Sequence, residues 1–386
     1  MQAECTIPFR DGVARVVRLD AIRNVDAWRE AFADKGKDHR FYEIVEDTLQ
    51  QDFEHRYIVF ADRDGQIRAV QPVFFVKQNL VEGVPALRRP VDFIRRWFPR
   101  FLTMRTLMIG NAAGNGHLGA CDEDDAPWLA SALAQSIRAY ARRAKASLVV
   151  FKDFESRARH LLGVLCDHNF TRIPSMPVTV LPLKYRDFDD YFASLSKATR
   201  KDLRRKFRRA ENAAPLQLEV VNDITPVVDE VYPLYLAVHE RSSMKFETLT
   251  KEFLCAIGQR MPDRARFFLW RENDRIVAFT IAFVHNGVFS DDYLGLDYRV
   301  ALDLHLYFLT FRDIISWCLT NGLTTYVSSP LNYEPKLRLD CVLGPLDLYV
   351  AHTSPLLNKV FGRILPLMEP TRHDPVLHRF PNAHEL

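Results

Sequence analysis

Apolar and polar positions alternate along two stretches of the chain, one in each half. The stretch from Arg266 to Phe279 and the stretch from Arg56 to Val70 match residue type by residue type, with one extra residue in the earlier turn. Period-two alternation on both sides of a polar turn predicts a β-hairpin in each stretch. A long helical pattern and a short apolar strand follow each hairpin, which indicates an internal duplication of about 200 residues.

The same patterns predict the other elements of each half. In the second half they predict the strand Val288–Leu296, the helix Leu304–Leu319 and the strand Thr324–Ser328. A single amphipathic helix is expected to open this half, from Tyr191 to Asn212. In the first half the main expected elements are the helix Ala126–Lys145, the strands Ser147–Phe151 and Met176–Pro182, and a short amphipathic helix or flap within Glu82–Phe101.

Length and composition favour two domains of mixed α+β structure. A chain of 386 residues with 48% apolar residues is too long for one ordinary core. We expect two tandem domains, 1–185 and 186–386, each a mixed and mostly antiparallel sheet flanked by helices. The six cysteines show no zinc-binding spacing, and no apolar run reaches the ~18 residues of a membrane span. These features and the absence of a signal-like N-terminus predict a cytoplasmic protein without a metal site or a transmembrane segment.

The expected helix at the start of the second half has one strongly cationic face. The net charge of the whole chain is only +3, so anion binding requires such local clustering. Only Asp202 and Glu211 offset its eight cations, which are Lys197, Arg200, Lys201, Arg204, Arg205, Lys206, Arg208 and Arg209. The face is a candidate site for a phosphate-bearing cofactor, an acidic carrier protein, RNA or a membrane surface, and a solvated face is the alternative.

Acidic residues interrupt the expected strand Val288–Leu296 at Asp291 and Asp292, and Tyr293 follows them. Aspartate is depleted in strands, and alternation places one of the two carboxylates on each face. A buried carboxylate needs a partner and tends to have a raised pKa, which suggests a base or an amine-binding group. An exposed strand end or a salt bridge is the alternative. Tyr333 and Lys336 follow the next short strand and are expected at its mouth, where the lysine would bind an anion or stabilise charge, or else be a surface residue.

The segment from Gly110 to Gly119 is rich in glycine and asparagine and is expected to line a cleft, with Asn115 and His117 as candidate contacts. Its G-x-G-x-x-G match lacks a helix that starts at the third glycine, and acidic residues follow, so a dinucleotide site is disfavoured. His117 and Asp122 have the spacing of some glycerolipid acyltransferases, a match frequent by chance. No nucleophile elbow or phosphate-binding loop of the Gly-Lys-Ser/Thr type is present.

The duplicated layout resembles the FemAB/BioF2-like acyltransferases of the GCN5-related N-acetyltransferase (GNAT) superfamily. Three stretches carry this resemblance: the basic segment Ser196–Phe207, the hairpin Phe267–Phe283, and Asn332-Tyr-Glu-Pro-Lys336 after the last short strand. The resemblance covers most of the chain, and most securely residues 191–348. It implies transfer of an acyl or aminoacyl group to an amine by direct attack, without a covalent enzyme intermediate.

The resemblance also implies roles for the candidate residues. Asp291, Asp292 and Tyr293 are the acid/base candidates, and Lys336 would stabilise negative charge. Donor or acceptor contacts would come from Lys197, Arg200, Lys201, Arg204, Tyr307, Tyr333, Asn115 and His117. No permanently bound cofactor is implied, because the acyl donor is a co-substrate. The acceptor would be a small-molecule or cell-envelope amine, and no DNA partner is expected.

The expected donor site departs from the family pattern. Where related enzymes have a glycine-rich pyrophosphate loop, this chain has Arg299-Val-Ala-Leu-Asp-Leu-His305. We expect Asp303 to cap the following helix and to occupy the amides that a phosphate would use. An acyl carrier protein or an aminoacyl-tRNA is therefore a candidate donor beside acyl-CoA. The alternative function is a non-catalytic protein that binds RNA or an anionic surface through the basic helix, residues 197–209.

Overall fold

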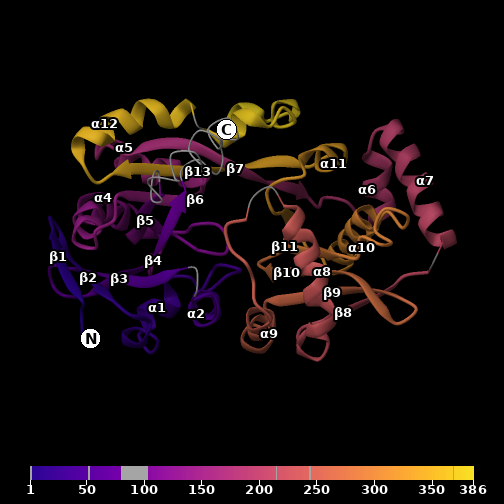
Figure 1. Ribbon diagram of the computed structural model, residues 1–386, viewed down its shortest axis with the longest axis horizontal. Helices are drawn as coiled ribbons and strands as arrows, with labels where there is room; N and C mark the ends of the chain where they lie inside the picture. The colour runs from indigo at the N-terminus through magenta and orange to yellow at the C-terminus, as the bar shows by residue number, and fades with distance from the viewer. Residues whose placement is uncertain (1, 51–52, 80–102, 214, 243–244, 368) are drawn as a thin grey trace, which may run out of the picture.

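The structure is a computed structural model that describes residues 2–50, 53–79, 103–213, 215–242, 245–367 and 369–386. All named strands belong to one thirteen-stranded sheet (Figure 1). The strands are β1 Cys5–Phe9, β2 Gly12–Val17, β3 Glu54–Asp62, β4 Ile67–Asn79, β5 Thr103–Ile109, β6 Leu148–Glu155, β7 Thr171–Pro182, β8 Gln217–Val221, β9 Ala265–Glu272, β10 Arg275–His285, β11 Val288–Leu296, β12 Thr325–Ser328 and β13 Val342–His352.

The order of the strands confirms the duplication. It runs β1-β2-β3-β4-β5-β6-β13-β7-β12-β11-β10-β9-β8. The hairpin β3–β4 corresponds to β9–β10, and in each half the strand after the hairpin reaches a parallel neighbour, β6 for β5 and β12 for β11. All other pairings of named strands are antiparallel, so the expected mixed and mostly antiparallel α+β fold is confirmed.

The two halves exchange strands at the middle of the sheet. Strand β13, near the end of the chain, lies between β6 and β7. Strand β7 in turn pairs with β12, from Thr325↔Pro182 to Ser328↔Thr179. Each half therefore contributes a strand to the sheet of the other, and backbone hydrogen bonds run without a break across the molecule. The division into domains at residue 185 stays a prediction.

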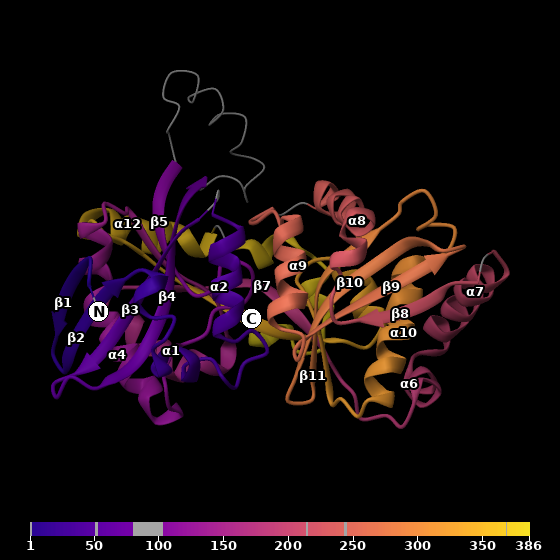
Figure 2. The same cartoon turned by 90° about the horizontal axis from the view of Figure 1, so that it is seen from below.

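Helices cover both faces of the sheet (Figures 1 and 2). Helices α4 and α5 pack on β6 and its neighbours in the first half, whereas α6, α7 and α10 pack on the second half. A further core joins the halves, because α2 contacts α9 through Phe41 and Phe253, whose rings are 5.9 Å apart. The helices are α1 Asp26–Glu30, α2 His39–Thr48, α4 Ala126–Arg143, α5 Arg159–Asp167, α6 Phe188–Ser194, α7 Lys197–Ala213, α8 Val228–Arg241, α9 Lys251–Arg260, α10 Leu306–Thr320, α11 Tyr333–Arg338 and α12 Pro355–Ile364.

The single helix expected from Tyr191 to Asn212 is wrong, because the structure divides it into α6 and α7. Leu195 is extended, with φ −66° and ψ 158°. The Ser196 hydroxyl accepts a hydrogen bond of 3.1 Å from the Thr199 amide and thereby caps α7. The apolar stripe of the predicted helix continues across the break, so the helical pattern did not predict that two helices meet there. The helix or flap expected within Glu82–Phe101 lies outside the described residues.

Candidate functional site

A cavity of about 1000 Å³ lies at the centre of the sheet, on the face that carries α2 and α9. Its floor is formed by residues of β5, β6, β7, β11, β12 and β13, so both halves contribute to it. Much of its wall is formed by residues 34–37, by the loop that holds Gly114, Asn115 and His117, and by Ser242, Phe246 and Glu247. The strand exchange thus places this cavity at the junction of the repeats.

The parallel strands β11 and β12 part at the edge of this cavity. Their pairing ends at Asp291↔Ser328, and the Ser329 amide then donates to the Asp291 carbonyl at 3.1 Å. On its other side β11 has a β-bulge, because Ile281 pairs with Tyr293 and Ala282 pairs with Asp291. Asp292 is the extra residue, and a bulge re-aims side chains in this way. Both Asp292 and Tyr293 consequently line the cavity.

Asp292 forms a shielded ion pair with a lysine of the first half. Its Oδ2 lies 2.5 Å from Lys37 Nζ, and the two side chains are only 17% and 15% exposed. Lys37 also donates to the Ala113 carbonyl at 3.1 Å, and its ammonium lies 4.7 Å from the centre of the Phe41 ring. Lys37 was not among the predicted site residues, because its partner is remote in sequence and no local motif marks it.

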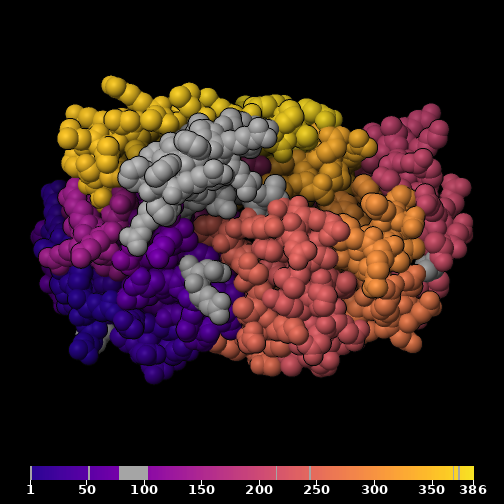
Figure 3. Space-filling view, in the orientation of Figure 1, coloured from indigo at the N-terminus to yellow at the C-terminus, as the bar shows by residue number. Residues whose placement is uncertain are grey.

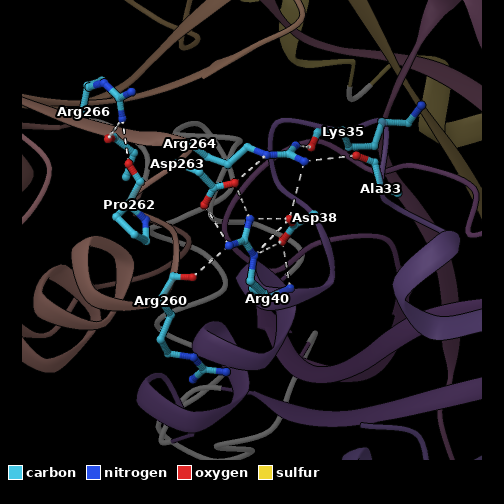
Figure 4. Close-up of polar contacts among 10 residues, drawn as sticks. Ala33, Lys35, Asp38, Arg40, Arg260, Pro262, Asp263, Arg264 and Arg266 are labelled. Atoms are coloured by element: carbon cyan, nitrogen blue, oxygen red, sulfur yellow. Dashed lines mark hydrogen bonds and ion pairs between the residues drawn. The ribbon is translucent and has the colours of Figure 1, made fainter. Parts of the chain in front are cut away.

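The loop that carries Lys37 is fastened to the second half (Figure 4). Arg40 donates to both carboxylate oxygens of Asp263, at 2.8 and 2.9 Å, and to Asp38 at 2.8 Å. Arg264 donates to the carbonyls of Lys35 and Ala33, the latter at 3.1 Å. Bidentate arginine–carboxylate contacts define orientation as well as position. This clamp, formed by Asp38, Arg40, Asp263 and Arg264, holds residues 33–38 where Lys37 reaches Asp292.

Asp291 faces away from the cavity, as the alternation predicted. Its carboxylate accepts hydrogen bonds from Thr280 Oγ1 at 2.6 Å and from the Tyr326 hydroxyl at 2.7 Å. Burial raises the pKa of Asp291, and these two donors oppose that shift. Asp291 is therefore placed to brace β11 against β10 and β12 at the point where the strands part.

Tyr293 projects from β11 toward the segment after α8. Its hydroxyl donates to Glu247 Oε1 at 2.6 Å. Burial raises the pKa of Tyr293 well above the ordinary value, and the negative charge of Glu247 adds to this shift. At neutral pH Tyr293 is a neutral hydrogen-bond donor at the cavity wall.

Lys336 and Tyr333 lie beneath the cavity rim, and neither is among the residues that line the cavity. Lys336 is 6% exposed, and its ammonium donates to the carbonyls of Ser329 and Leu331, the latter at 2.9 Å. Burial lowers the pKa of Lys336 to about 8. Tyr333 is also buried and donates to the Pro177 carbonyl at 2.8 Å. The open strand mouth expected for these two residues is wrong: Lys336 supports the rim loop from below.

The first half contributes two of the predicted contacts and a second lysine. Asn115 and His117 line the cavity, and burial lowers the pKa of His117 to about 4, so its ring is neutral at pH 7. Lys152, also in the wall, lies 2.7 Å from Asp153 and donates to the Gly114 carbonyl at 3.1 Å. Tyr307 is absent from the lining residues and packs against Phe308 instead.

Comparison with known proteins gives a family for the part of the chain that holds α7, β11 and β12. Residues 197–334 match the family model described as acetyltransferase (GNAT) domain. This match lies within the second half and shows its likeness to a GNAT acetyltransferase domain. No curated protein matches the chain.

Solved structures show the same fold over most of the chain. The crystal structure of FemX has a TM-score of 0.53 and 13% identity, and the likeness covers 86% of this chain and 96% of that one. The C-terminal domain of a protein named as a lysylphosphatidylglycerol synthetase, from Agrobacterium fabrum, has a TM-score of 0.50 and 15% identity, covering 86% and 94%. A conserved protein of unknown function from Bacteroides thetaiotaomicron has a TM-score of 0.50 and 14% identity, covering 90% and 99%. At these identities the likeness shows the fold alone.

The basic helix α7 of the GNAT domain lies at the far end of the molecule from the first half (Figures 1 and 2). None of its cations lines the cavity. Several serve the fold: Arg200 donates to the carbonyls of Ala193 and Leu195, and Arg204 lies over the Phe192 ring at 5.1 Å. In the described part of the chain, the cations of α7 without a partner are Lys197, Lys201 and Arg208.

The start of α10 differs from the expectation that Asp303 caps this helix. Asp303 does not cap the helix, because its carboxylate is 74% exposed and lies 3.1 Å from Arg209. The N-cap position is His305, which has a left-handed backbone with φ 47° and makes no side-chain cap. Asp303 therefore does not occupy the amides at the start of α10, which was the expected reason for excluding a phosphate there.

Neither a metal centre nor a membrane span is found in the described residues. They contain no group of three histidine, cysteine, aspartate or glutamate side chains that could hold a metal ion. Over the same residues, no helix is long and apolar enough to cross a membrane.

Proposed function

We propose that the chain is an N-acyltransferase that transfers an acyl or aminoacyl group to an amine bound in the central cavity. The observation that carries this proposal is the position of Asp292, at a bulge where β11 and β12 part and facing a cavity of about 1000 Å³. The GNAT domain matched over residues 197–334 supports acyl transfer as the reaction class. Fold likeness by itself does not establish a function.

The proposed reaction is a direct attack. The amine nitrogen bonds to the acyl carbonyl carbon while the bond to the thioester sulfur or ester oxygen breaks. Asp292 accepts the proton that the amine loses, and the leaving group is protonated in turn. A backbone amide near the parted strands stabilises the charge on the carbonyl oxygen. The cavity supplies proximity by holding donor and acceptor together, so no covalent intermediate is needed.

Lys37 and Lys336 are proposed to act through the site rather than on the reacting atoms. Lys37 holds the Asp292 carboxylate in place through the ion pair until an amine acceptor arrives. Lys336 fixes the loop at Ser329 and Leu331 through its two carbonyl contacts. Tyr293 and Asn115 contribute hydrogen-bonding groups to the wall. We propose acyl-CoA, an acyl carrier protein or an aminoacyl-tRNA as donor, a small-molecule or cell-envelope amine as acceptor, and the cytoplasm as location.

Calorimetric titration with acetyl-CoA and a long-chain acyl-CoA tests the donor first, followed by transfer assays with the donor that binds. Asp292→Asn should reduce transfer by about 100-fold or more, the usual contribution of a general base. The matched control is Asp34→Asn, since Asp34 lines the same cavity but pairs with Lys35. Equal activity of the Asp292 variant and the wild type would refute the role of Asp292.

A recognition protein without catalysis is the second candidate, favoured by the unpartnered cations of α7. If α7 binds RNA, charge reversal of Lys197, Lys201 and Arg208 should weaken binding with a reduced salt dependence, while Asp292→Asn should have no effect. These three cations are better targets than Arg200 and Arg204, whose replacement would also disturb the fold.

A further inference from the structure

Most of the exposed large apolar side chains in the described residues gather on one helix. Of the seven that the described chain exposes, five belong to α12 and the turn that follows it: Leu356 (79% exposed), Leu357 (47%), Val360 (51%), Ile364 (44%) and Leu367 (68%). Isolated exposed leucines are ordinary, whereas a contiguous group marks an interaction surface. We call this group the α12 apolar face.

The spacing of these residues places them on one side of α12. At 100° per residue, Leu356, Val360, Ile364 and Leu367 fall within a single arc, and Leu357 extends it. On the adjoining side, Phe361 of the helix and Leu365 of the turn that follows it pack against the protein. The helix is thus anchored by one apolar side and presents a second apolar side outward, which a helix that served only the fold would not need.

Unpartnered cations border the α12 apolar face. Lys359 and Arg363 are exposed, α12 contains no acidic residue, and neither cation has a carboxylate partner within the part of the chain that the structure describes. Arg142 adds a third exposed cation, since it donates to the carbonyl of Thr353 at 3.1 Å, immediately before the helix. Apolar side chains flanked by lysine and arginine are the pattern of helices that lie in the surface of an anionic bilayer.

From this arrangement we propose that α12 is a docking surface for an anionic phospholipid membrane. The helix lies along the outer edge of the molecule beside β13, where a flat surface can approach it (Figures 1 and 3). Leucine and isoleucine side chains enter the boundary between headgroups and acyl chains, and Lys359 and Arg363 contact lipid phosphates.

Docking in this way has a consequence for the cavity. Pro370 lines the cavity wall and follows Leu367 by three residues, so their Cα atoms are at most about 11 Å apart. A membrane that holds the α12 apolar face therefore lies close to one edge of the cavity. This inference does not depend on the proposed acyl transfer, because binding to lipid can be measured without any substrate.

Sedimentation with vesicles tests the proposal on the full chain. The probes are vesicles of phosphatidylcholine alone and of phosphatidylcholine mixed with phosphatidylglycerol. Wild type should sediment with the mixed vesicles, and binding should weaken as salt rises. Leu356→Asp combined with Val360→Asp should weaken binding at least tenfold, since two buried aliphatic contacts are lost. Lys359→Glu combined with Arg363→Glu should weaken it about fivefold or more per cation.

A matched control is available in Leu302→Asp. Leu302 is as exposed as Leu356, at 79%, but it lies before α10, so its replacement should leave vesicle binding unchanged. Circular dichroism of each variant checks that the chain remains folded.

Three results would overturn the proposal. Wild type that fails to sediment, but forms a dimer that Leu356→Asp dissociates, would show that a second copy covers the face. Failure to sediment together with a lower melting temperature for Leu356→Asp would show that the chain itself covers it. Equal binding to both kinds of vesicle, without salt dependence, would show that the cations do not contact lipid.

Discussion

Replacing Lys37 by methionine should destabilise the protein through loss of the ion pair with Asp292. The two side chains are 15% and 17% exposed, so the remaining carboxylate would be largely buried and unpaired. Methionine keeps much of the packing against Phe41 but cannot donate to the Ala113 carbonyl, a contact of about 1 kcal/mol. We expect a loss of about 3 kcal/mol for Lys37→Met and about 2 kcal/mol for Asp292→Asn.

A double-mutant cycle measured by urea unfolding isolates the pair. Because each single variant already breaks the same contact, the double variant should lose about 3 kcal/mol and not the sum of about 5, which is a coupling energy of about 2 kcal/mol. Lys35→Met is the control, since Lys35 pairs with the 59% exposed Asp34 and should change stability by less than about 1 kcal/mol. Additive single effects would refute the contact between the two halves, and with it the role of Lys37.

Three further predictions concern the residues around the cavity. Lys336 has a folded-state pKa of about 8 against 10.5, so unfolding takes up a proton between these pH values and stability should rise by roughly 3 kcal/mol from pH 8 to 10.5. Urea unfolding of Lys336→Met should not show that rise in stability with pH. An equal rise in the variant would show that Lys336 is not its cause. Arg264→Met should speed hydrogen exchange in residues 33–38, because it removes contacts that hold this loop. Arg266→Met is the control and should not change this exchange, because Arg266 contacts only its own segment. Equal exchange in both variants would show that the clamp is not needed to hold residues 33–38. Tyr293→Phe should cost about 2 kcal/mol in urea unfolding by removing the hydrogen bond to Glu247, and an unchanged midpoint would show that this bond is not formed.

The local pattern was sufficient for the strands and the helix around the cavity in the second half. Alternation predicted the hairpin before β11, β11 itself and β12, and helical spacing predicted α10 to within two residues. It also placed Asp291 and Asp292 on opposite faces of β11, which the contacts of the two carboxylates confirm. These features depend on periods of two and 3.6 residues, which can be read within one short stretch of the sequence.

The break between α6 and α7 and the start of α10 show the limit of such patterns. The Ser196 hydroxyl caps α7, so a new helix starts there although the apolar stripe continues past this residue. Asp303 has the residue type of a helix cap, but α10 begins at Leu306, so His305 and not Asp303 takes the N-cap position. In both cases the backbone conformation of a few residues, and not the residue types of the segment, decides where the helix begins.

The sequence by itself determined the repeat, the elements of each half and the unusual carboxylates of β11, because these depend on near neighbours in the chain. Only the tertiary structure decided that β13 enters between β6 and β7, that the two halves enclose one cavity, and that Lys37 meets Asp292. Those outcomes depend on contacts between residues remote in sequence, and such contacts produce no periodic pattern of apolar residues in the sequence. The ion pair between Lys37 and Asp292 forms only because two sets of contacts bring the halves together. These are the backbone hydrogen bonds of the shared sheet and the clamp at Arg40 and Arg264.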